Sequence, residues 1–432
     1  MFSKVFPKLT EKSYILQHLD LVILGALLTL YVDSLVAPSG AIGAGIFVIS
    51  LLTLLKMLIN GEKYTINKAE LFLIIYYLIV FISLCGSTMF GLSLKGFIKT
   101  TLYILFYFSV TNLFKTNIKY LIYVIFVIAL GVIFESGVSW IQNFSHVQMI
   151  SGWQDVTNLN PEQIMIRVYG TLKPYNPNLL GGYFVVGLPA VLCCSTGLFA
   201  KKYYKLSALF AIGTLLGISA LVFTGSRGAY IAFFVMSLAI FFISLKFFGK
   251  NYKRLFLLIS EIGITVFCLI IFLSTSLKAR ILSIFAMRAD SSNSFRFNVY
   301  QSAWEMFKDN WLLGIGVGNK NFREIYGLYM KTGFDALSAY NIYLETAVES
   351  GVFALFAFII YLGMQIFNSV SFILKSTDVI KIILTVCALV SLIGVMSHGM
   401  VDTVFFRPQI QLIFWTMMAV ITVTTDKTSY GL

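Results

Sequence analysis

Two stretches of this sequence combine arginine with a tight turn or a helix start, a pattern typical of anion binding. Arg227 lies in Thr224-Gly-Ser-Arg-Gly228, between two long apolar runs. A guanidinium group binds phosphate through paired hydrogen bonds, and flanking glycines let the backbone approach a ligand closely. Arg167 precedes Asn176-Pro-Asn178, which predicts a helix capped by Asn176, and helix N-termini also attract anions. The alternatives are an arginine that only reaches lipid headgroups and a helix start that is only capped.

Carboxylates, an amide and a histidine form the next group of candidates. Asn341, Glu345 and Glu349 are spaced by four residues, so they share one helix face. A carboxylate inside a membrane helix is costly and therefore suggests function, although an ion pair with either arginine above would be a structural alternative. A histidine, a carboxylate and an arginine follow in the segment 397–408: His398, Asp402 and Arg407. His398 is either a titrating group or a buried histidine at a helix end.

The segment 276–339 is rich in basic and aromatic residues. Its six singled-out basic residues are Arg280, Arg288, Arg296, Lys308, Lys320 and Arg323. A helix from Arg296 to Trp311 would align Tyr300, Trp304, Phe307 and Trp311 on one stripe. Such a stripe indicates internal packing, a helix lying in the membrane interface, or a face that stacks on sugar rings. The following glycines, at 314, 316 and 318, lack the preceding strand of a nucleotide-binding loop and predict a tight turn.

The elements that position these residues are membrane helices. The chain of 432 residues is 58% hydrophobic and only 12% charged, whereas soluble domains have about 25% charged residues. Runs long enough to cross about 30 Å of hydrocarbon lie near 19–37, 41–59, 69–86, 97–114, 118–140, 177–199, 206–224, 228–247, 255–275, 340–368, 380–399 and 409–425. We therefore expect an all-α integral membrane protein of about twelve spans, forming a single polytopic domain over 1–432.

The net charge of +13 is explained by orientation in the membrane and not by nucleic acid. Lysines and arginines are concentrated in the short segments on the side of the N-terminus, which the positive-inside rule places in the cytoplasm. No small-residue cleavage site follows the first apolar run, so we expect an uncleaved helix. An even number of spans puts both termini in the cytoplasm. The two long segments, 141–176 and 276–339, then lie outside, next to most of the candidate residues.

These segments, in this order, resemble the O-antigen ligase and polymerase superfamily of bacterial envelope polysaccharide synthesis. The resemblance runs from about Arg167 to Trp415. It is carried by Asn176-Pro-Asn178, Ser226-Arg227-Gly228, Arg296 with Trp304, Leu313-Gly-Ile-Gly316, Asn341 with Tyr343-Leu344, Glu349-Ser-Gly351, and His398 with Asp402. Within the superfamily, the segments 336–341 and 402–408 are most similar to a subgroup labelled as inorganic-carbon (bicarbonate) transporters.

The resemblance implies an enzyme of the bacterial plasma membrane with its active site outside the cell. Such enzymes transfer a glycan from undecaprenyl diphosphate to a hydroxyl of an acceptor glycan or lipid, without a metal or other cofactor. Their partners are these substrates and membrane lipids, with no nucleic acid. The resemblance places Arg227 and Arg296 on the diphosphate. Substrate contacts are expected from Arg167, Asn176, Asn178, Asn341, His398, Asp402 and Arg407.

One position departs from the ligase pattern. Ligases have a histidine just before the asparagine of the tenth span, and it is thought to help deprotonate the acceptor. This chain has Tyr340 there, whose ordinary pKa near 10 makes it a poor base. The proton would pass to Glu345, to His398 or to no residue, which favours a polymerase or a diverged branch. The alternative function is a small-anion transporter, although such a protein has no evident use for the long segment 276–339.

Overall fold

The computed structural model describes residues 13–145, 167–247 and 272–426, with single residues between 253 and 269. Within this part of the chain, ten helices are long and apolar enough to cross a membrane. They are α4 (Ser39–Asn60), α5 (Lys68–Cys85), α6 (Phe90–Thr116), α7 (Ile118–Phe144), α8 (Pro177–Ala200), α9 (Tyr204–Phe223), α10 (Arg227–Phe247), α15 (Ile342–Lys375), α16 (Val379–His398) and α17 (Pro408–Thr425).

These ten helices confirm a multi-pass, all-α membrane fold. They correspond to ten of the twelve predicted spans. The predicted span 19–37 forms α3 (Leu19–Asp33), a helix of 15 residues that follows the short α2 (Tyr14–Gln17). Ten of the 21 residues of the predicted span 255–275 lie outside the described residues, as does most of the segment 141–176.

Polar side chains at the helix starts determine where several spans begin. Asn67 accepts a hydrogen bond from the backbone of Glu70, whose side chain bonds back to the Asn67 N–H, a capping box that starts α5. Asn176 caps α8 and Asn341 caps α15, as the sequence predicts for Asn176. Such caps satisfy N–H groups that have no partner inside the helix, which matters most where water is scarce.

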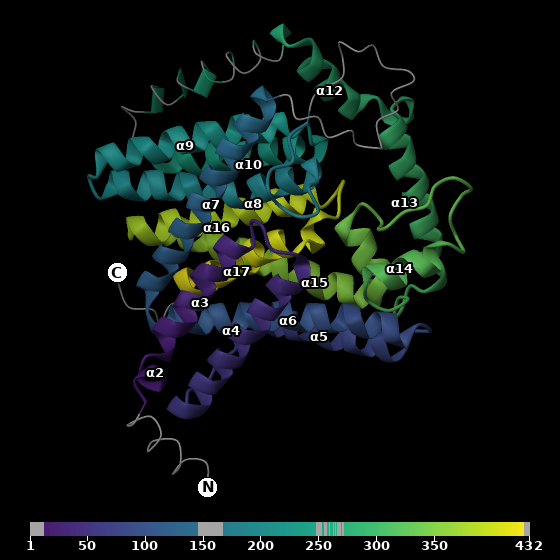
Figure 1. Cartoon of the computed structure of the whole chain (residues 1–432), viewed down its shortest axis with the longest axis horizontal. Coiled ribbons are helices and arrows are strands. Elements are labelled where there is room, and N and C mark those ends of the chain that lie inside the picture. Colours follow the sequence, from purple (N-terminus) through teal and green to yellow (C-terminus); the bar gives the residue numbers. More distant parts are fainter. Residues whose placement is uncertain are drawn as a thin grey trace.

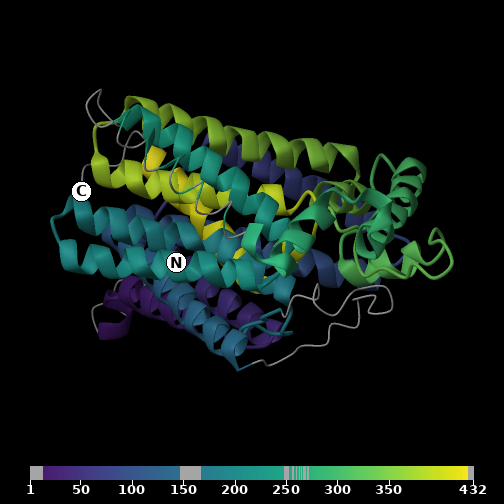
Figure 2. The ribbon, with the colours of Figure 1, turned by 90° about the horizontal axis from the view of Figure 1, so that it is seen from above.

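The helices form a bundle in which α16 and α17 lie between α8–α10 on one side and α5–α6 on the other (Figure 1). The view from above shows the same long helices running side by side (Figure 2). In α17 the most apolar window is 89% buried, so this helix is central and faces almost no lipid. Its polar residues therefore bond to other helices. For example, Thr422 pairs with Tyr107 of α6 at 2.8 Å.

One end of the bundle carries an additional helical segment. We call it the loop end: α5, α9 and α16 end there, and α8, α10 and α15 begin there. The segment contains α12 (Thr275–Phe285), the 3-10 turn η2 (Met287–Ala289), α13 (Ser291–Asp309) and α14 (Asn319–Tyr326). Figure 1 shows α13 lying across the loop end, roughly perpendicular to the spans. A separate small core holds the segment together: Val299, Ala303, Met306, Ile315, Phe322, Tyr326, Ala336, Ala339 and Val348.

A break in α15 attaches this segment to the bundle. Gly351 has φ 81°, ψ 173°, which interrupts the helix and frees backbone groups for other partners. The N–H of Val352 donates to the carbonyl of Trp311 at 2.9 Å, and the N–H of Ile315 donates to the carbonyl of Val348 at 3.0 Å. A side chain at Gly351 would collide with the carbonyl of Leu312, so glycine is required here. The glycines 314–318, all with positive φ, form the turn that the sequence predicts.

Candidate functional site

Arg227 is the first residue of α10 and lies at the loop end, buried to all but 6% of its surface. Gly225, with φ 61°, makes the turn from α9 to α10 tight enough to bring this side chain inside. Its Nη1 atom lies 2.8 Å from Oδ1 of Asp290 and also contacts Oγ and the carbonyl of Ser283, at 3.3 and 3.4 Å. All the described contacts of Arg227 use Nη1. Its remaining donors are therefore available to a ligand.

A second arginine is linked to a third through an amide and a carboxylate. Nη2 of Arg296 lies 3.2 Å from Oδ2 of Asp402, and the same oxygen accepts a hydrogen bond from Nδ2 of Asn178 at 3.2 Å. Oδ1 of Asn178 in turn accepts from Nη2 of Arg167 at 2.6 Å. Nε of Arg167 donates to the carbonyl of Thr224 at 2.8 Å, in the turn before Arg227. The predicted residues Arg167, Asn178, Arg296 and Asp402 are thus brought into one hydrogen-bonded chain.

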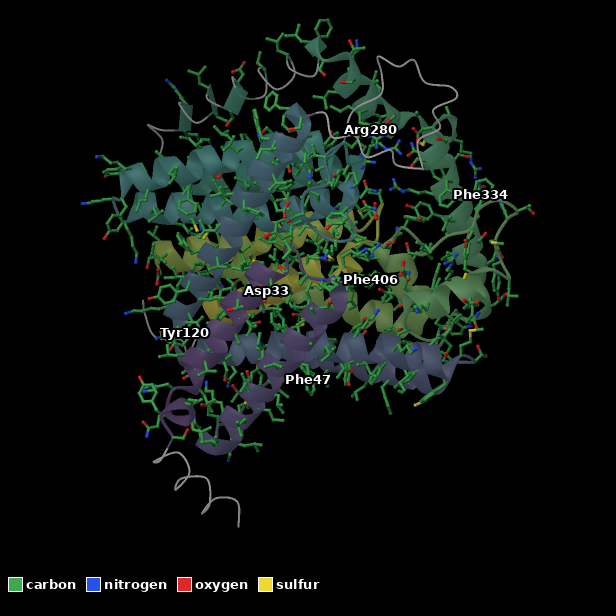
Figure 3. All side chains as sticks on the ribbon, viewed as in Figure 1. Asp33, Phe47, Tyr120, Arg280, Phe334 and Phe406 are labelled. Carbon is green, nitrogen blue, oxygen red and sulfur yellow. The ribbon has the colours of Figure 1, made fainter. Side chains whose placement is uncertain are left out.

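Arg280 of α12 is a fourth arginine of this cluster. Its Nε donates to the carbonyl of Gly225 at 2.8 Å, so the Arg227 turn is held from two sides. Figure 3 shows Arg280 at the loop end, above the region of α13. In the sequence it was only one of six basic residues in a long segment. No spacing distinguished it from the exposed Arg323, and only the packing of α12 against α10 identifies it.

The cluster carries more positive than negative charge. The four guanidinium groups have two carboxylates, Asp290 and Asp402, as their ion-pair partners among the described residues. Burial, then the charge of Arg280, lowers the pKa of Arg167 to about 9, and burial, then Arg227, lowers the pKa of Arg280 to about 10. Both remain protonated at neutral pH. Since like charges held together in a partly buried place are unfavourable, a bound anion would stabilise the cluster.

A cavity of about 140 Å³ opens beside Arg227 and Arg296. Its other lining residues are Gly228, Ile231, Ile284, Met287, Asn293, Phe297, Tyr300 and Val401. The cavity therefore presents two guanidinium groups and one amide within largely apolar walls. In such surroundings the field of a fixed cation is screened less than in water.

Tyr340 lies beside the cluster but is not suited to be a base. The guanidinium carbon of Arg296 lies 5.7 Å from the centre of the Tyr340 ring, a cation–π contact. Burial, and next the charge of Asp402, raises the pKa of Tyr340 to about 12. Its phenol therefore stays neutral at physiological pH. The Tyr340 carbonyl accepts a hydrogen bond from Tyr300 at 3.1 Å, so this residue also positions the cavity wall.

The two carboxylates of α15 are buried and separate from the arginines. Oε2 of Glu345 accepts a hydrogen bond from the N–H of Ala339 at 3.0 Å, and Glu345 does not line the cavity. The carbonyl of Glu349 accepts bonds from Ser83 and from the N–H of Gly316. The described ion pairs of the arginines are with aspartates. The alternative of an ion pair between these glutamates and Arg227 or Arg167 is therefore not what the structure contains.

The other predicted residues lie at the periphery. His398 is buried against Gly182 and Gly228, and neither ring nitrogen has a hydrogen-bond partner among the described residues. Asn341 caps α15 and donates to the carbonyl of Met400 at 3.0 Å, which ties α15 to the end of α16. Asn176 and Arg407 are exposed helix-cap residues. Oδ1 of Asn176 accepts a hydrogen bond from the N–H of Asn178, a member of the cluster, at 2.7 Å, whereas Arg407 has no described contact to the cluster.

The fold and this site define a class: a multi-pass membrane protein with an arginine-rich, anion-attracting cavity at one end. Residues 212–359 match the family model described as O-antigen ligase. This match confirms the predicted resemblance to the ligase and polymerase superfamily. The transporter subgroup is not confirmed. No curated protein matches the sequence.

The matched range contains part of the site. It includes Arg227, Arg280, Arg296 and Tyr340. Arg167, Asn178 and Asp402 lie outside it and complete the cluster through α8 and the loop before α17.

Proposed function

We propose that this protein is a glycosyltransferase of the bacterial plasma membrane. It transfers a glycan from undecaprenyl diphosphate to a hydroxyl group of an acceptor glycan or lipid during surface polysaccharide synthesis. The observation that carries the proposal is the cavity faced by Arg227 and Arg296, in a cluster of four arginines with two aspartates. Two guanidinium groups at a shared cavity fit the two phosphates of a lipid diphosphate.

The chemistry follows from the charges. The acceptor oxygen attacks the anomeric carbon of the donor, and the bond from that carbon to the phosphate oxygen breaks. The electron pair leaves with undecaprenyl diphosphate, which gains one negative charge, and the hydroxyl proton passes to a base. Arg227, Arg296, Arg167 and Arg280 would offset the developing charge, because fixed cations in a low-dielectric site stabilise a leaving anion.

The residue that accepts the proton of the acceptor hydroxyl remains to be assigned. Tyr340 is unsuited to it because its phenol stays protonated. Glu345 and His398 are the two candidates. Glu345 bonds to the N–H of Ala339, next to Tyr340 in the chain, and His398 packs against Gly228, but neither lines the cavity. Asn178 and Asp402 would orient Arg296 and Arg167, and Asn341 would hold the start of α15 in place.

The proposed orientation puts the loop end outside the cell. The start of α3 and the end of α17 both lie at the end of the bundle opposite the loop end. Asp20 pairs there with Lys56 near the end of α4, and Asp426 lies 3.9 Å from Lys115 near the end of α6. The charge asymmetry of the sequence assigns that end to the cytoplasm. The lipid-linked donor would then be used on the outer face of the membrane.

A deletion strain tests the proposal. Loss of a ligase leaves long lipid-linked chains, whereas loss of a polymerase leaves single lipid-linked units. Normal lipid-linked and mature glycan in the deletion strain would reject the glycosyltransferase proposal. Inorganic-carbon transport, which the domain match does not favour, would then be the remaining candidate function. Complementation with the wild-type chain must restore the glycan in the first two cases.

A further inference from the structure

Helix α13 has three distinct faces. One face is buried against α14 and α15: Asn298, Val299, Ser302, Ala303 and Met306. A second face is polar, with Lys308 and Glu305 paired at 2.5 Å in solvent. The third face carries aromatic rings at helical spacing and continues into the residues after the helix. We call it the aromatic band: Phe297, Tyr300, Trp304, Phe307 and Trp311.

The aromatic band begins in the arginine cavity. Phe297 and Tyr300 line that cavity together with Arg296, from the same helix. One turn further along α13, the ring of Trp304 lies 5.2 Å from that of Phe307. Trp304 and Trp311 are each 52% exposed, whereas the packed face of the helix is buried. Phe307 also packs against the small core of the segment. The two tryptophans do not, and their rings remain available for a ligand.

The other end of the band reaches the lipid-facing surface of the bundle. The carbonyl of Trp311 is bonded to Val352 at the break in α15. The next residues, Leu312 and Leu313, are also exposed, and Leu313 lies against Gly86 at the end of α5. The outward residues of α5 and α6 near this point are apolar and exposed: Phe81, Ile82, Met89 and Phe90. The band is thus continuous with a surface that a bilayer covers.

We propose that the isoprenoid tail of the lipid diphosphate lies along the aromatic band, from the bilayer to the arginine cavity. This inference rests on the proposed function. A sugar chain would need hydrogen-bond partners, and the rings of the band supply few. The Tyr300 hydroxyl already donates to the Tyr340 carbonyl, and the two phenylalanines have no polar group. An apolar chain needs only apolar area, which exposed tryptophan supplies in large amount.

The test compares three probes on the purified full-length protein: inorganic pyrophosphate, farnesyl diphosphate and undecaprenyl diphosphate. Pyrophosphate reports on the arginines alone, and the two lipids add a short and a long tail. The Trp304→Ser/Trp311→Ser double variant is compared with Leu328→Ser. Leu328 is an 84% exposed apolar residue of the same segment, outside the band.

We expect wild-type affinity to rise with tail length. The affinity of the double variant for undecaprenyl diphosphate should fall by about tenfold or more, which corresponds to the loss of one or two buried apolar contacts. Its affinity for farnesyl diphosphate should fall less. Its affinity for pyrophosphate should stay unchanged, as should all three affinities of Leu328→Ser. Unchanged binding of undecaprenyl diphosphate to the double variant would overturn the inference. The band would then contact only the lipids of the membrane.

Three further outcomes separate this inference from others. If the double variant lost glycan transfer in membranes but bound bare undecaprenyl diphosphate normally, the band would be assigned to sugar and the tail rejected. An equal loss for pyrophosphate would mean that the substitutions disturb the arginines, and would also reject it. If wild-type protein bound no pyrophosphate or lipid diphosphate, the proposed function itself would fail, whatever the band variants did.

Discussion

Replacing Arg227 with lysine separates two roles of this arginine. If it binds the diphosphate, lysine cannot replace it, because a point charge keeps the sign but loses the paired donors. If it only extends its charge toward lipid headgroups, lysine serves equally well. The burial of Arg227, and its place on the cavity wall, favour the first role.

The size of the effect follows from the donors. In Arg227, Nη1 is already used by Asp290 and Ser283, while the rest of the guanidinium group is left for a ligand. A lysine has one nitrogen, and Asp290 would attract it. The substrate would then lose up to two charge-assisted hydrogen bonds, each of about 1.5–3 kcal/mol. We therefore expect Arg227→Lys and Arg227→Ala both to lower glycan transfer by about 10²-fold or more, the usual scale for removing a donor to a leaving anion.

The assay is glycan transfer by membranes that contain equal amounts of each variant. The matched control is Arg323→Lys, in the same segment. Arg323 forms an exposed ion pair with Asp335 at 2.9 Å, and such pairs contribute under about 1 kcal/mol. Its activity should stay near wild type. Full activity of a well-expressed Arg227→Lys variant would refute the diphosphate assignment.

Three further predictions concern the partner of Arg227, the base and the orientation in the membrane. Asp290→Asn should tighten pyrophosphate binding about tenfold, because a carboxylate that competes for Arg227 is removed while asparagine still caps α13; weaker binding would contradict a competing role. Tyr340→Phe should keep most activity and an unchanged pH profile, since burial raises the pKa of Tyr340 to about 12, whereas Glu345→Gln should lose about 10²–10⁴-fold if Glu345 is the base. Equal loss in both variants would make Tyr340 catalytic. Reporters fused near Asp155 and Lys320 should be extracytoplasmic and those near Lys202 and Lys250 cytoplasmic, although Asp155 and Lys250 lie outside the described residues; a cytoplasmic signal at Lys320 would reverse the proposed orientation.

The apolar runs determined the fold class. A bilayer requires each span to be apolar for about 20 residues and to satisfy its own backbone hydrogen bonds, so length and composition alone identify helices such as α8 and α16. Local signals were equally sufficient for the cap at Asn176 and the glycine turn at 314–318. They also identified a helix at Arg296, although its bounds are Ser291–Asp309 and not the predicted 296–311. Each depends only on neighbours within a few residues.

The tertiary structure alone decided which charges meet. Arg227 pairs with Asp290 and Arg296 with Asp402. The sequence had left open an ion pair of Glu345 or Glu349 with Arg227 or Arg167. Asn178 and Asp402 are 224 residues apart along the chain. Helical spacing reports which residues share a face of one helix. It does not report which other helix that face meets, because this depends on packing across the whole bundle.

The same distinction applies to residues that the sequence left undistinguished. Arg280 differs from Arg323 only because α12 packs beside the turn at Gly225, while Arg323 points to solvent. Trp304 fits a packing stripe equally well by spacing, yet a different face of α13 is buried. The sequence determined the spans, the caps and the types of group available for chemistry. Their combination into a cavity with excess positive charge came from contacts between segments far apart, which no local pattern encodes.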